Sequence, residues 1–140
     1  MALVNAAGAI SDLGALLAGM HPVLRPGRYA FATLSPGQYI EPEHVIASIR
    51  ESEGLSVVLA EEHARALGLS VAFTAAWITL DVHSDLAAVG LTAAFSQALA
   101  QAGIGCNVVA GTMHDHIFVP VDQADEAMAV LQALQRNAIG

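Results

Sequence analysis

The first half of the chain combines short apolar patterns of strand period and of helical period. Residues 28–34 alternate strictly, with Tyr29, Phe31 and Thr33 on one side of a strand and three aliphatic residues on the other. Residues 41–53 fit a helix face or a short strand equally well, so periodicity does not decide this segment. The other elements predicted here are a helix capped by Ser11 or Asp12 and ending near residue 19, a strand at 55–59, and a helix at 61–67 that stops at Gly68.

The second half reads as strand, helix, strand, strand and helix. A long extended segment at 71–82 contains the only tryptophan, Trp77. The pattern after it predicts a helix at 91–102, strands at 104–110 and 116–119 joined by a polar turn, and a helix beyond Asp122. This order lacks one strand of the ferredoxin-like βαββαβ motif, and it predicts an α+β fold.

Composition and charge narrow the partners that such a fold can bind. The 140 residues are 55% hydrophobic and 13% charged, they include no lysine, and the net charge is −8. Nucleic acid and anionic membranes attract clustered basic residues, so we expect neither as a partner. An exterior so poor in charge indicates that part of it is buried by self-association.

The single cysteine, Cys106, excludes an intramolecular disulfide and a thiolate cluster for zinc. A reducing cytoplasm is therefore the expected location, and Cys106 is expected to serve packing. The apolar N-terminal stretch has no basic segment and is interrupted by Asp12, which argues against a secretory signal. No apolar run approaches the length of a membrane span, and no cofactor is expected.

Three blocks of sequence carry a more specific resemblance. They are ESEGLSVVLAEEHARALGL at 51–69, AWITLDVHSDLAAVGLTAAFSQALAQAGIGCNVVAG at 76–111 and HDHIFVPVDQADEAMAVL at 114–131. These blocks resemble the ACT-domain family, and more narrowly small stand-alone bacterial proteins with tandem ACT-like halves, which are related to the regulatory ACT pairs of aspartate kinases. The resemblance implies two ferredoxin-like halves, here 1–69 and 70–140, with antiparallel sheets and helices on one face. It also implies a homodimer that binds amino acids or similar small ligands at its interfaces.

The resemblance places a ligand-binding site as well. In such domains the loop between the first strand and the first helix, with its glycine, forms one wall of the site, and here that loop is 83–92. The facing second strand and the following hairpin complete the site. The residues implied in this way are His83, Gly90, Leu91, Thr92, Asn107, Val108, His114 and Asp115.

Elementary electrostatics supports the same corner independently. The first turn of a helix has unpaired N–H groups and a partial positive charge, so the start of the helix at 91–102 can hold a ligand carboxylate that Gly90 allows to approach. The ammonium group of an amino acid would then need an acceptor, for which Asp81, Asp85 and Asp115 are candidates. Replacing Gly90 with valine is expected to abolish ligand binding and to leave the fold largely intact.

Plainer interpretations accompany these residues. Gly90 can simply permit a positive φ, Thr92 can satisfy backbone donors, and Asp115 can form a turn. Asn107, expected in a buried strand, must find hydrogen bonds either from a ligand or from the neighbouring backbone.

The leading hypothesis is a non-enzymatic, regulatory protein that binds an amino acid. The alternatives are a protein-interaction module without a ligand and a small metal-dependent enzyme that uses His83, His114 and His116. Ser84 with His83 and Asp85 superficially resembles a catalytic triad, but contiguous residues in an extended loop cannot form a proton relay. The sequence therefore favours binding over catalysis.

Overall fold

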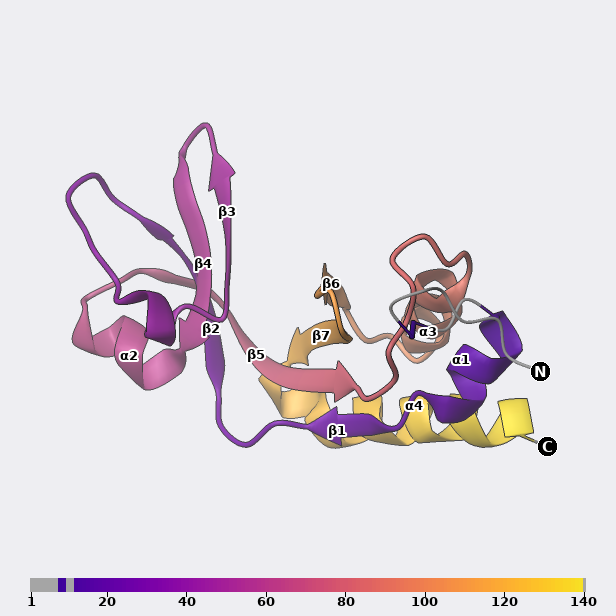
Figure 1. Cartoon of the computed structure of the whole chain (residues 1–140). Coiled ribbons are helices and arrows are strands. Elements are labelled where there is room, and N and C mark those ends of the chain that lie inside the picture. Colours follow the sequence, from indigo (N-terminus) through magenta and orange to yellow (C-terminus); the bar gives the residue numbers. More distant parts are fainter. Residues whose placement is uncertain (1–7, 10–11, 140) are drawn as a thin grey trace.

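Four α-helices and seven strands form the described part of the chain, which the computed structural model gives as residues 8–9 and 12–139 (Figure 1). Two single turns of 3₁₀ helix, η1 and η2, lie between them. The elements in chain order are α1 (Leu13–Gly19), β1 (Pro22–Leu24), β2 (Tyr29–Leu34), η1 (Pro42–His44), β3 (Ala47–Glu51), β4 (Gly54–Ala60), α2 (Glu61–Ala66), β5 (Val71–Leu80), α3 (Leu91–Gln101), β6 (Asn107–Ala110), β7 (Asp115–Pro120), η2 (Val121–Gln123) and α4 (Ala124–Ile139).

Strand β5 connects two sets of strands into one antiparallel sheet. Its first half pairs with β2, where Ala75 lies opposite Tyr29, and its second half pairs with β7, where Ala75 lies opposite Pro120. The strand order is β3-β4-β2-β5-β7-β6, with β1 also paired to β5. The expected division into halves at 69/70 immediately precedes this shared strand and stays a prediction.

The strand that the second half lacks in sequence order is supplied by the N-terminal segment. β1 pairs antiparallel with β5, with Val23 opposite Thr79, and the N–H of Arg25 donates to the carbonyl of Trp77 at 2.8 Å. With β5, α3, β6, β7 and α4, this strand completes a ferredoxin-like unit. Three residues are too few for a periodic pattern, so the local sequence contains no signal for β1.

The helices cover one face of the sheet. Period-two alternation turns Ile78 and Ile117 toward α1, α3 and α4, where Leu16, Phe95 and Leu131 complete the core. Ala30 and Ala32 point to the same side of β2 and pack with Ala64 of α2 in a second, smaller core. The predicted α+β architecture with helices on one face is confirmed.

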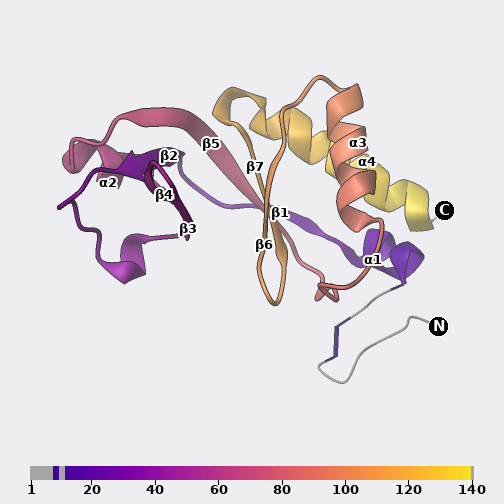
Figure 2. The same ribbon diagram turned by 90° about the horizontal axis from the view of Figure 1, so that it is seen from above.

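The opposite side of the sheet, called the open face below, carries most of the aromatic rings. Phe31, Phe73, Trp77 and Phe118 belong to one cluster on this side, and no described helix contributes to it. Figure 2 shows α3 and α4 together on one side of β5 and β7. Apart from Ile46, which immediately precedes β3, the residues of this cluster belong to strands.

Most predicted elements are found close to their expected bounds. The side chain of Asp12 caps α1 by accepting from the N–H of Ala15 at 3.0 Å, whereas Ser11 lies outside the described residues. The undecided segment 41–53 contains the turn η1 followed by β3. The strand expected to begin at 104 begins only at Asn107, because α3 closes with a bond from the N–H of Ile104 to the carbonyl of Leu99.

Replacing Val23 with proline is expected to destabilise the protein by about 1–3 kcal/mol. The N–H of Asp81 donates to the carbonyl of His21, and the N–H of Arg25 donates to the carbonyl of Trp77. Because hydrogen-bonded pairs recur at every second residue of an antiparallel ladder, the N–H of Val23 between them also points toward β5. Proline at this position therefore leaves a carbonyl of the sheet unpaired. The N–H of Leu24 points away from β5, and Leu24→Pro is the matched control with a smaller effect. Urea unfolding of both variants measures the difference, and equal losses would contradict the pairing.

Candidate functional site

The loop between β5 and α3 ends in a glycine whose conformation the fold requires. Gly90 is the N-cap residue of α3 with φ of +110°, a region that residues with a side chain rarely adopt. A Cβ at this position would lie 3.0 Å from Cδ2 of Leu13 in α1. The valine substitution considered above would therefore strain the loop and displace Leu13, so it does not separate ligand binding from folding.

A small cavity of about 130 Å³ lies beside the first turn of α3. The first N–H groups of any α-helix have no partner within the helix. In α3 the N-cap residue Gly90 has no side chain that could accept a hydrogen bond from them. The lining residues are Ser84, Asp85, Leu86, Ala88, Gly90, Leu91, Thr92, Ala110 and Asp115.

Asp115 is the charged group most deeply placed in this cavity. It is the first residue of β7 and is only 8% exposed, and the hydroxyl of Ser84, 7% exposed, donates to its Oδ2 at 3.5 Å. That distance is long for an O–H···O bond. Burial raises the pKa of the Asp115 carboxyl, and the bond from Ser84 lowers it to a lesser extent.

Asp85 lines the same cavity but has a local role. Its Oδ1 accepts from the N–H of Ala87 at 2.9 Å, and its backbone carbonyl accepts from Ala88 at 2.9 Å. These two bonds shape the loop that leads to Gly90. Asp81, the third candidate acceptor, is exposed and lies 3.5 Å from Nε2 of His114. Of the three carboxylates considered from sequence, Asp115 is thus the one that is both buried and in the cavity.

The structure brings together only some of the residues implied by sequence. Gly90, Leu91, Thr92 and Asp115 line the cavity. The others do not: Val108 lines a larger groove over the sheet, which meets the cavity at Ala110, and His83, Asn107 and His114 line neither. Strand alternation explains part of this division, because neighbouring residues of a strand project to opposite faces.

Asn107 differs from the expectation of a buried strand residue. It is exposed at the beginning of β6, and its Nδ2 donates to the carbonyl of Phe118 at 3.5 Å. The requirement for a ligand to satisfy its amide therefore disappears. From the sequence, Ser84 suggests only a nucleophile. Its contact with Asp115, which is 31 residues away, has no signal in the local sequence.

His116 lies on the open face in a hydrogen-bonded cluster. The indole N–H of Trp77 donates to its Nδ1 at 3.0 Å, and since indole is only a donor, the neutral ring has its proton on Nε2. The guanidinium of Arg25 lies 4.7 Å from the centre of the Trp77 ring. Burial lowers the pKa of His116, and the nearby Arg25 and His114 lower it further.

The three histidines do not form a metal site. Nδ1 of His116 is already an acceptor for Trp77, and within residues 8–9 and 12–139 no group of three His, Cys, Asp or Glu side chains is placed to hold a metal ion.

Cys106 is half-buried, and burial raises the pKa of its thiol. None of the described helices combines the length and apolar character that crossing a bilayer requires.

Models of known protein families match the chain in both parts of the sheet. Two models described as ACT domains match residues 8–76 and 72–133 in tandem. The chain belongs to the ACT-domain family. The two ACT matches overlap at 72–76, within the strand β5 that pairs with both sets of strands. Among curated proteins, none matches this chain.

Solved structures with similar folds come from several organisms. A protein of unknown function from Vibrio cholerae, described as a possible transport protein, is 42% identical with a TM-score of 0.75 and alignment over 88% of this chain and 95% of that one. A protein from Agrobacterium tumefaciens is 19% identical with a TM-score of 0.62, covering 81% and 87%. The ligand-free regulatory subunit of aspartate kinase from Thermus thermophilus is 11% identical with a TM-score of 0.59, covering 81% and 95%, and shares the tandem ACT fold.

The free energy of unfolding is expected to fall as the pH is lowered from 7.5 to 5.5, in part through His116. Its pKa in the folded state lies below its usual value, so the unfolded chain binds more protons below about pH 6.5 and gains stability relative to the fold. His116→Gln keeps an acceptor for Trp77 and should remove this part of the pH dependence. Trp77→Phe should reduce it only in part, because burial and Arg25 remain. Urea unfolding at both pH values tests this, and a slope unchanged by His116→Gln would contradict it.

Proposed function

We propose that this chain is a non-enzymatic, regulatory ACT-domain protein of the cytoplasm that forms a homodimer and binds a small α-amino acid at the start of α3. The observation that supports the ligand most directly is the buried carboxylate of Asp115 in the cavity that the first turn of α3 also lines. An α-amino acid has one group for each of these partners.

The carboxylate of the ligand would accept hydrogen bonds from the free N–H groups at the start of α3. The helix dipole adds a partial positive charge there, and Leu91 and Thr92 both line the cavity. The exposed hydroxyl of Thr92 is a further donor at the mouth.

The ammonium group of the ligand would bind Asp115. A buried carboxylate with one long hydrogen bond is poorly compensated, and a cation restores the lost interactions. The raised pKa of Asp115 has the same origin, since burial without a cation disfavours the charged form. Binding would therefore stabilise the ionised carboxylate.

The size of the cavity limits the side chain of the ligand. Its volume of about 130 Å³ is roughly four times the ~30 Å³ that a water molecule occupies in the liquid. This space suits glycine, alanine or serine better than lysine or an aromatic amino acid.

Asp115→Asn is expected to weaken the binding of glycine, alanine or serine by about ten- to hundredfold, because a charge-assisted hydrogen bond contributes about 1.5–3 kcal/mol. Asparagine has the same shape and can still accept from Ser84, so the fold should persist. Calorimetric titration of each amino acid into wild type and variant measures the difference. Asp81→Asn, which changes an exposed carboxylate outside the cavity, is the matched control and should bind as the wild type does.

Two further measurements complete this test. Binding to the wild type should weaken as the pH is lowered from 7.5 toward 4.5, because protonation of Asp115 removes the partner of the ammonium group, whereas Asp115→Asn should lose this dependence. In thermal melts with the twenty amino acids tested one at a time, the small amino acids should stabilise the protein, by about 2.7 kcal/mol at a concentration of 100 Kd. No stabilisation by any of them would contradict the proposal and favour a protein-interaction module.

A further inference from the structure

We propose that the open face of the sheet is where a second copy of this chain docks. This inference rests on the dimer in the proposed function and assigns the surface that forms it. The face is on the side of the sheet opposite the helices, whereas Asp115 and the amino-acid cavity are on the helix-covered side. Ala110 of β6 lines both the groove and the cavity, so the two sites adjoin there. Substitutions at residues that line only one of them test the two sites separately.

The aromatic rings on the open face pack on one another in one cluster that no described helix covers. The Phe118 ring is fully buried beneath half-buried neighbours, with ring centres 5.4 Å from Phe31 and 5.9 Å from Trp77. Phe73 packs on Phe31 at 5.5 Å. Three of the four phenylalanines and the single tryptophan thus lie on a face that no described helix covers. Aromatic residues are enriched in the cores of protein interfaces.

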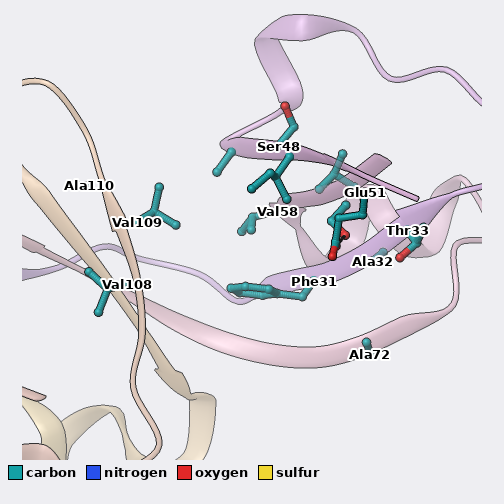
Figure 3. A pocket seen from close by; sticks show the side chains of 14 residues that line it. Phe31, Ala32, Thr33, Ser48, Glu51, Val58, Ala72, Val108, Val109 and Ala110 are labelled. Atoms are coloured by element: carbon teal, nitrogen blue, oxygen red, sulfur yellow. Dashed lines mark hydrogen bonds between the residues drawn. The ribbon is translucent and has the colours of Figure 1, made fainter. Parts of the chain in front are cut away.

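A groove of about 610 Å³ runs across this face (Figure 3). Phe31 lies at its base, Val58 and Ile49 come from the β3–β4 hairpin, and Val108 and Val109 come from β6 on the other side. The groove is bounded by β3 and β6, which are the two ends of the strand order. The strong twist of the sheet turns both edges toward the same side (Figure 1), so the face is concave.

The distribution of charge selects a second copy as the occupant. With a net charge of −8, two copies repel each other unless they meet through a surface that has few acidic groups. Glu51 is the one charged residue that lines the groove, and it accepts a hydrogen bond from the hydroxyl of Ser56. Arg25, over Trp77, lies on the same face outside the groove. A strongly charged partner would find few groups of opposite charge in the groove itself, whereas a second copy brings the same apolar lining.

The extent of the face is of the order that a dimer needs. Six strands at a spacing of about 4.8 Å and about five residues in length cover roughly 500 Å² in projection. The accessible surface of a rough, concave face exceeds its projection, and a standard interface takes about 800 Å² from each partner. A two-fold arrangement would use the same face in both copies, so that Ile49 of each copy contacts the groove of the other.

Ile49→Glu tests this assignment in the full chain. Ile49 is 65% exposed, so the substitution should leave the fold intact, but it would bury an unpaired charge in the dimer and raise the dimer dissociation constant by about a hundredfold or more. Thr33→Arg, an exposed position in the same groove, should dissociate the dimer as well. Leu67→Glu is the matched control, because Leu67 is 42% exposed at the end of α2, on the helix-covered side, and its dimer should persist.

Sedimentation velocity without added amino acid measures association at micromolar concentrations, and far-UV circular dichroism confirms that each variant is folded. We expect the wild type and Leu67→Glu to be dimeric, and Ile49→Glu and Thr33→Arg to be monomeric. A monomeric wild type would overturn both the proposed dimer and the assignment of the open face as its interface. Dimers that persist in both groove variants overturn the face alone. Because no amino acid is present, neither result depends on whether the cavity binds one.

Discussion

Strand β5 hydrogen-bonds to β1, β2 and β7, and the two faces of the molecule follow from its alternation. Residues Ala76, Ile78 and Leu80 point to the helices, and the residues between them point to the open face. A shift of one residue in its pairing would exchange both sets at once. Because the apolar core under α3 and α4 accepts only one of the two sets, this burial fixes the register of β5 against β7.

The same alternation separates the two proposed interactions. Asp115 and His116 are adjacent in β7, yet Asp115 lies in the cavity at the start of α3 and His116 bonds to Trp77 on the open face. A metabolite and a second copy of the chain would therefore contact neighbouring residues from opposite faces, and the two sites adjoin at Ala110, which lines both.

Long periodic segments were predictable from the sequence, and short or long-range features were not. The alternation at 28–34 and the helical spacing at 91–102 gave β2 and α3 nearly to the residue. β1 has three residues and is defined only by its partner, so no local pattern could reveal it. The helix start and Asp115 were implied by a resemblance and by helix electrostatics. The placement of Asn107 and His114 away from the cavity depends on where β6 and β7 begin, which sequence patterns define poorly.

Two residues at the start of α3 differ in what they indicate about a ligand. The positive φ of Gly90 and its contact with Leu13 already account for a glycine there, so Gly90 is no evidence for binding. No comparable internal reason accounts for Asp115. Among the described residues, Ser84 alone donates a side-chain hydrogen bond to its carboxylate, at 3.5 Å, and a buried carboxyl needs more than that to offset desolvation. The case for an amino-acid ligand therefore depends on the burial of Asp115 with a single long side-chain hydrogen bond.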